Sequence, residues 1–405
     1  MDKAEGFNIE RLRSMEFISN PYIVYKEMRK VSPTFYLQNE RYFWILNYKD
    51  CASILGDLNY GKKFRRTYEE MTDSNYDDLT HYDPNNPKRN MLFLDPPDHT
   101  RLRNLVAKAF TPRNIEKMRP FIRSLAEGLI KNVSDGRDFD LMSGFAGPIP
   151  AYTIANILGV PNSDMQKFKN WSDSVALSLD STRSKEEYEE ARVAGENLSL
   201  YISNLIDKKK DSLEEDLLSD LIIAEDSGQK LTHRELIATL TLLLVAGHET
   251  TTNLIGNGFL ALLKNRDQLE MLKSDRSLLK SAVEEFLRYD PPVQQVARAV
   301  YKTTVISGTE IREGSRVSVV IGSANRDPEA FENPDNLDIT RKENRHLSFS
   351  KGIHFCIGSQ LARLEAEIAF DILMDNLSDV KIIAEPEWRK NANMHGMKTL
   401  LVRKN

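Results

Sequence analysis

The sequence predicts a mainly α-helical protein with a small β-sheet, an α+β fold. Apolar residues recur at three- and four-residue steps over much of the chain, which is the period of an amphipathic helix. Strand-like runs are few and short, and they comprise Tyr42–Leu46, Val300–Ile306, Arg316–Ile321 and Thr399–Val402. The hydrophobic content of 40% in 405 residues is enough for a large core.

The composition bounds the organisation and the partners. No linker rich in Gly, Ser or Pro divides the chain, so residues 1–405 are predicted to form a single domain. The net charge of −5 argues against nucleic acid as a partner. Two cysteines and a polar start, Met1–Gly6, predict a cytoplasmic protein. The longest apolar run, Leu236–Gly247, is shorter than the ~20 residues of a membrane span.

Proline marks the predicted helices of the first half. A helix is expected to open after Pro96-Pro97, and another to begin at Pro112 with an apolar stripe from Ile115 to Leu129. Before them, Thr67–Asn90 has no clean periodicity and is predicted to be a long loop.

A long central helix is predicted from a capping box at Thr232 through about Lys264. In its middle, Gly247 and a run of threonines are poor helix formers, and they predict a local kink with freed carbonyls. Glu249 and Thr250 place an acid beside an alcohol at that point, which could relay protons. The alternative is a buried helix whose Thr hydroxyls bond to the preceding turn.

Glu285 and Arg288 lie three residues apart, close enough to pair on one face of a helix. Most such pairs are solvated and contribute little. The sequence ends this helix at once, because Pro291-Pro292 follows.

Cys356 lies in a loop punctuated by Gly352 and Gly358, directly before a helical pattern. A thiol at a helix start feels the positive end of the helix dipole and free N–H groups, so we expect the thiolate to be favoured there. A zinc site or an iron–sulfur cluster needs about four ligands, and the only other cysteine is Cys51. Haem iron, in contrast, needs only one cysteine thiolate as its ligand.

This loop resembles the haem-binding loop of the cytochrome P-450 family. The matching positions are Phe349, Gly352, His354, Cys356 and Gly358. Ser350 departs from the pattern, because the family usually has glycine there. The resemblance implies a cytochrome P-450 fold with a long kinked central helix over the haem, haem b as cofactor, and Cys356 as axial ligand of the iron.

Other motifs agree with this family. Its oxygen-activation motif matches Ala246, Gly247, Glu249 and Thr250, of which Glu249 and Thr250 are the implied catalytic pair. Its structural Glu-x-x-Arg pair matches Glu285 and Arg288, with Arg341 as the third member. Its contacts to the haem propionates match His99, Arg103, Arg298 and His354.

The implied function is a haem-thiolate monooxygenase that inserts one atom of O2 into a small or mid-sized organic substrate. Electrons are expected from NAD(P)H through a ferredoxin or flavodoxin and its reductase. A non-catalytic haem-thiolate sensor or carrier and a peroxide-driven peroxygenase are the alternatives. A basic cluster could receive an acidic electron carrier or be only a solvated face, and it comprises Arg101, Lys108, Arg113, Lys117 and Arg119.

The resemblance also suggests which segments line the substrate pocket. They are Thr67–Asn90, Leu242–Ala246, Val293–Ala297 and Met394–Met397. Polar groups among them, at Gln294, Gln295 and His395, favour a partly oxygenated molecule such as a polyketide, macrolide or terpenoid over a plain alkane. Alternatively, the two glutamines point to solvent.

Overall fold

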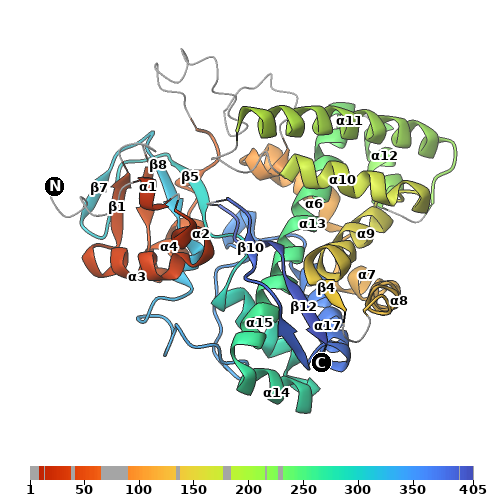
Figure 1. The fold of residues 1–405 in the computed structure, drawn as a ribbon. Coiled ribbons are helices and arrows are strands. Elements are labelled where there is room, and N and C mark those ends of the chain that lie inside the picture. Colours follow the sequence, from red (N-terminus) through yellow and green to blue (C-terminus); the bar gives the residue numbers. More distant parts are fainter. Residues whose placement is uncertain are drawn as a thin grey trace.

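The computed structural model describes residues 9–12, 14–37, 42–64, 90–133, 137–176, 184–214, 217–226, 231–391 and 393–404. The predicted loop Thr67–Asn90 lies outside these ranges except for Asn90. The five-stranded sheet and the first helices form one side of the molecule, on the left in Figure 1, and a helical body forms the other.

The helices dominate, as predicted. In the first half they are α1 (Ile9–Leu12), α2 (Met15–Ser19), α3 (Pro21–Val31), α4 (Tyr48–Gly56), α6 (Asp98–Ala107), α7 (Pro112–Glu116), α8 (Arg119–Ile130), α9 (Pro148–Ile157) and α10 (Met165–Ala176). In the second half they are α11 (Lys185–Lys210), α12 (Leu217–Asp226), α13 (His233–Lys264), α14 (Arg266–Ser274), α15 (Leu279–Tyr289), α16 (Ile321–Ala324) and α17 (Ser359–Asn376).

The strands form small sheets. The largest has the order β1 (Thr34–Leu37), β2 (Tyr42–Ile45), β8 (Arg316–Val319), β5 (Val296–Val300) and β3 (Tyr60–Gly61). Its β2–β8 pair is parallel, and its other pairs are antiparallel. The smaller sheets pair β6 (Thr304–Ile306) with β7 (Thr309–Ile311), β10 (Glu387–Trp388) with β11 (Met397–Thr399), and β12 (Leu401–Lys404) with both β4 (Asp138–Asp140) and β9 (Val380–Ile382).

The central helix α13 runs through the helical body (Figure 1). Its predicted capping box is present. The Thr232 hydroxyl oxygen accepts from the Glu235 N–H, and the Glu235 carboxylate accepts from the Thr232 N–H. The helix is unbroken from His233 to Lys264. The Thr250 hydroxyl donates to the carbonyl of Ala246 at 2.8 Å, so the hydroxyl bonds to the preceding turn.

Three predicted elements are divided in the structure. The helix expected from Pro112 to Leu129 is split into α7 and α8, because Pro120 lacks an N–H and its ring crowds the carbonyl four residues earlier. The run Val300–Ile306 is not one strand but the end of β5 and the whole of β6. Thr399–Val402 likewise spans the end of β11 and the start of β12.

The largest hydrophobic cluster fills the helical body and includes side chains of α8, α9, α13, α15 and α17. Smaller clusters lie against the five-stranded sheet. Among the described residues, no helix is both long enough and apolar enough to cross a bilayer.

Candidate functional site

The cysteine loop makes a tight turn before α17. Ser350 and Gly352 both have positive φ, 61° and 69°. A Cβ on Gly352 would lie 2.6 Å from the carbonyl oxygen of Leu55, so only glycine fits there. Ser350 keeps a left-handed conformation that strains a residue with a side chain by about 1 kcal/mol or more. The loop therefore forms although Ser350 stands where the family pattern has glycine.

Cys356 is partly exposed as a whole residue. Its backbone N–H donates to the carbonyl of Phe349 at 2.9 Å. Burial raises the pKa of this thiol, whereas a backbone hydrogen bond at Gly358 and the charges of Arg103 and Arg363 lower it. The backbone donor at Gly358 therefore lowers the pKa in the direction expected for a helix start, but burial has the larger effect.

On α13, Ala246 is exposed while Val245 before it is buried. Thr250 lies one turn further along the same face and is partly exposed, and Glu249 is buried. The helix thus presents Ala246 and the Thr250 side chain on an open face. Gly247 faces Ile154 of α9. A Cβ added at Gly247 would lie 3.5 Å from that side chain, which is an ordinary van der Waals distance.

The four predicted contacts to propionates are brought together. The rings of His99 and His354 lie 4.5 Å apart. The pKa of His354 falls to about 2 through burial and the charges of Arg298, Lys62, His99 and Arg103. Arg103 also donates from Nη2 to the carbonyl of Phe355 at 2.6 Å, which ties α6 to the cysteine loop.

Lys62 joins this group, and no sequence motif pointed to it. We call His99, Arg103, Arg298, His354 and Lys62 the cation cluster. Its ammonium is buried and donates to the carbonyl of Ala297 at 3.1 Å, and Arg298 donates to the same oxygen at 3.0 Å. Burial and the charge of Arg298 lower the pKa of Lys62 well below its usual value, against the opposing charge of Asp95. Nothing in the pattern around Lys62-Lys63 marks one lysine as buried.

The cation cluster is short of acceptors. His99 Nδ1 and His354 Nε2 are buried and have no hydrogen-bond partner within the described chain. Burial lowers the pKa of Arg298 to about 10, with only Asp95 and Tyr301 opposing. Buried donors in such numbers are normally satisfied by anionic or polar partners, so the cluster suits the carboxylates of a ligand.

The predicted pair of Glu285 and Arg288 is wholly buried, with distances of 2.7 and 2.8 Å between the guanidinium nitrogens and the carboxylate oxygens. Arg341 joins it at 3.1 Å from Nε to Glu285 Oε2. Asn344 and the backbone N–H of Asp338 also donate to Glu285. We call Glu285, Arg288 and Arg341 the buried brace, and it has the three members that the sequence predicted.

The comparisons with known proteins agree with this arrangement. The family model described as Cytochrome P450 matches residues 155–400, more than half of the chain. The chain belongs to the cytochrome P450 family. It is therefore a haem-dependent oxidoreductase of the monooxygenase type, as its named relatives are.

Curated P450 relatives match nearly full length. The biotin biosynthesis cytochrome P450 of Bacillus subtilis is 39% identical over 93% of this chain and 93% of its own. The cytochrome P450 monooxygenase PikC of Streptomyces venezuelae is 38% identical over 96% of this chain and 92% of its own. Among solved structures, P450BioI in complex with an acyl carrier protein ligated to hexadec-9Z-enoic acid has a TM-score of 0.88 at 37% identity, covering 96% of this chain and 100% of that one.

A second buried glutamate of this P450 has no predicted role. Glu365 of α17 is 1% exposed, and its Oε1 has no hydrogen-bond partner among the residues that the structure describes. Burial raises its pKa to about 8, although hydrogen bonds with Thr153 and Thr251 lower it. The Thr251 side chain comes from α13, next to Thr250. An acidic residue within an apolar helical stripe was the only signal that the sequence offered.

The polar groups of the predicted substrate segments are engaged inside the protein. Gln294 is 2% exposed and donates to Tyr22 and to the carbonyl of Pro291. Gln295 donates to Asn393 Oδ1, and His395 Nδ1 lies 2.7 Å from Asp290 Oδ1. The alternative, that both glutamines point to solvent, is therefore wrong for Gln294. These bonds also occupy groups that were expected to orient a substrate.

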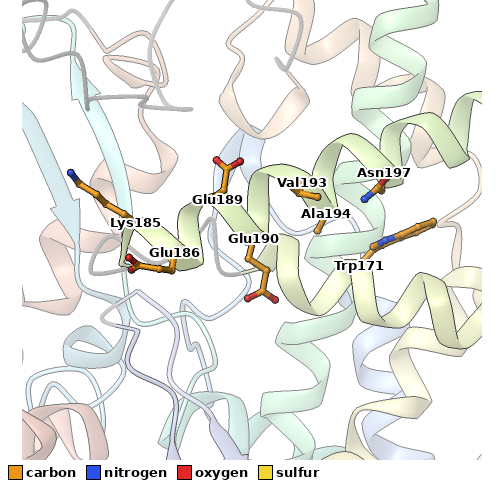
Figure 2. A pocket seen from close by; sticks show the side chains of 8 residues that line it. All are labelled: Trp171, Lys185, Glu186, Glu189, Glu190, Val193, Ala194 and Asn197. Carbon is orange, nitrogen blue, oxygen red and sulfur yellow. The ribbon is translucent and has the colours of Figure 1, made fainter.

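An open groove of about 720 Å³ lies between α10 and α11 (Figure 2). Trp171, Val193 and Ala194 give it an apolar part, and glutamates of α11 give it acidic walls. In Figure 2 the carboxylates of Glu189 and Glu190 point in different directions, so they form no common site. None of the predicted site residues lines this groove, and we assign the chemistry to the surroundings of Cys356 instead.

Proposed function

We propose that Cys356 is the axial ligand of the haem iron and that the cation cluster binds the haem propionates. The observation that carries this proposal is the pair of buried, unpartnered ring nitrogens at His99 and His354, beside the buried cations Lys62 and Arg298. Propionates are strong acceptors for such donors. Two carboxylates there would offset the crowding of positive charge.

Haem, when bound, supplies the iron centre at which O2 is activated. The chain contributes the environment. Cys356 supplies a thiolate, and the charges of Arg103 and Arg363 favour that charged form. The open face of α13 at Ala246 and Thr250 would leave room for the cofactor. Thr250 and the buried Glu249 would hold and deliver protons on the same helix, once the Thr250 hydroxyl releases the Ala246 carbonyl.

The ligand assignment is tested by the absorption spectrum of the reduced carbon monoxide complex. The purified parent protein is expected to show the red-shifted Soret band of thiolate ligation, and Cys356→Ala is expected to lose it. Survival of that band in Cys356→Ala would remove Cys356 from the iron.

The relay is tested by coupling. Thr250→Ala is expected to bind haem normally and to consume reduced nicotinamide while releasing hydrogen peroxide instead of product. Equal coupling in variant and parent would exclude Thr250 from the relay. Product formation from hydrogen peroxide at the full rate without an electron donor would favour a peroxygenase, and the absence of any oxidation would favour a sensor or carrier.

We propose that electrons come from NAD(P)H through an acidic ferredoxin or flavodoxin and its reductase in the cytoplasm. Lys108, Arg113 and Lys117 are exposed, whereas Arg101 pairs with Glu235 and Arg119 with Glu116. The first three are therefore the residues available for steering. Lys108→Glu or Arg113→Glu should slow reduction of this protein by the electron carrier, most strongly at low salt. Reduction rates that depend neither on these substitutions nor on ionic strength would show that the carrier does not bind at this face.

The substrate proposed is a mid-sized, partly oxygenated natural product. One relative, PksS of Bacillus subtilis at 37% identity, is named for polyketide biosynthesis. The neighbour P450BioI instead holds a fatty acyl chain on a carrier protein, and CYP267B1 holds myristic acid. A screen for the low- to high-spin shift of the haem separates these classes. A shift with fatty acids and none with polyketides or macrolides would overturn this substrate proposal.

A further inference from the structure

A cation is stacked on the aromatic ring that begins the cysteine loop. The guanidinium carbon of Arg363 lies 4.5 Å from the centroid of the Phe349 ring. Its Nε and Nη2 donate to the two carboxylate oxygens of Glu284 at 2.6 and 2.9 Å. A planar guanidinium that is held by a two-point fork at one edge and by a ring on its face has a defined position.

His346 completes this arrangement. Its Nδ1 accepts from the backbone N–H of Ser348 at 3.2 Å, so its Nε2 carries the hydrogen and donates to Glu284 Oε2 at 3.1 Å. The His346 ring also lies 5.8 Å from the Phe349 ring. Burial raises the pKa of Glu284, but hydrogen bonds from Arg363 and His346 outweigh it and bring the pKa to about 2. We call Arg363, Glu284, His346 and Phe349 the proximal clamp.

The proximal clamp is connected to Cys356 in two ways. The Phe349 carbonyl accepts the Cys356 N–H at 2.9 Å, so the residue whose ring is clamped also holds the backbone of the cysteine. The second connection is electrostatic. Arg363 lies in the second turn of α17, seven residues after Cys356, and its stack on Phe349 holds its charge against the cysteine loop.

We propose that Arg363 is a positioning residue that fixes the Phe349 ring and, through the Phe349 carbonyl, the Cys356 backbone, and that its stacked charge raises the reduction potential of the iron that Cys356 would hold. This inference rests on the proposed ligand role of Cys356. A positive charge near the ligand favours the reduced state, which carries one more electron. The fork to Glu284 keeps that charge over Phe349, while the negative charge of Glu284 partly offsets it.

The test compares reduction midpoints and reduced carbon monoxide spectra of holoenzyme variants. Arg363→Gln is expected to shift the midpoint to more negative values and to increase the fraction of protein that lacks the thiolate band. Arg123→Gln is the matched control, because Arg123 also pairs with an acid of α17, at 2.8 Å from Asp371, but contacts no part of the cysteine loop in the contacts described. It should leave both readouts unchanged.

Two further variants separate charge from packing. Arg363→Lys keeps the charge and should fall between parent and Arg363→Gln. Glu284→Gln removes the offsetting negative charge and should shift the midpoint to more positive values, which a merely structural role does not predict. Parental values in Arg363→Gln, or a negative shift in Glu284→Gln, would overturn the inference. Absence of the thiolate band in the parent protein would instead refute the ligand assignment, so the two failures are distinguishable.

Discussion

Two glutamates are equally buried in this P450 and behave differently. Glu285 of α15 is 0% exposed and accepts hydrogen bonds from two arginines, an asparagine and a backbone N–H. Glu365 of α17 is 1% exposed, has two threonine hydroxyls beside it, and its pKa rises to about 8. The same side chain is an ion-pair partner at one site and a proton-carrying acid at the other. The partners, and not the burial, decide which.

The energetic consequences differ accordingly. A buried ion pair stabilises the fold little more than an apolar pair does, because the desolvation of both charges offsets their attraction. Removing one partner is nevertheless costly, because it leaves a buried charge that is not compensated. Replacing a buried neutral acid by its amide leaves no uncompensated charge in the interior. The comparison therefore predicts a large loss at the buried brace and a pH-dependent gain at Glu365.

The largest effect is expected for Arg288→Ala. It removes one of the two arginines that pair with the buried Glu285 carboxylate and takes the Arg288 donors away from the carbonyls of Asn325, Pro334 and Asn336, so the free energy of unfolding should fall by about 3–5 kcal/mol. Chemical denaturation and haem content measure this loss. Arg276→Ala, which breaks partly exposed pairs with Asp371 and Asp375, is the control and should cost about 1 kcal/mol or less. Equal losses in both variants would contradict the special cost of the brace.

The next effect is a pH dependence carried by Glu365. Its folded pKa of about 8 lies above the usual value of 4.5, so the unfolded chain releases this proton first and stability falls as pH rises from about 4.5 to 8. Glu365→Gln should remove that decline, on the order of a few kcal/mol. The variant should match the parent near pH 5 and unfold at higher denaturant at pH 8. Parallel stability curves for both proteins would show that Glu365 is already ionised in the folded state.

The smallest effect sharpens the assignment of partners. The Thr251 hydroxyl lowers the pKa of Glu365, so Thr251→Val should move the onset of ionisation to higher pH and cost about 1 kcal/mol. Infrared spectra of the carboxyl group across this pH range measure the shift. Thr250→Ala removes a neighbouring hydroxyl that bonds to Ala246 instead, and it should leave the ionisation of Glu365 where it is.

Much of the fold could be predicted from local signals. The capping box at Thr232 placed the start of α13 correctly, and its end near Lys264 was also correct. The three-residue spacing of Glu285 and Arg288 showed only that they could pair, and the family resemblance implied the brace and its third member, Arg341. Where the prediction was wrong, two local signals competed. The apolar stripe from Ile115 to Leu129 continues across Pro120, and the proline decides where the helix breaks.

The parts that could not be predicted depend on three-dimensional neighbours. Lys62 is buried only because β3 places it beside Arg298 and Asp95, which are far away in sequence. Glu365 lies in an apolar stripe of α17, but its partners come from α9 and α13. The donors at the helix start that lower the pKa of Cys356 are visible in the sequence, whereas the burial that raises this pKa is not.

The adjacent positions of Glu284 and Glu285 make α15 intolerant of a change in length. Successive side chains of an α-helix diverge by about 100°, so one glutamate reaches Arg363 of α17 while the other reaches Arg341 beyond β8. A single inserted or deleted residue between Val283 and Arg288 would rotate both carboxylates away from their partners at once. Among homologous chains, we therefore expect length variation to accumulate in the surface turns before and after α15 and to be absent from this stretch.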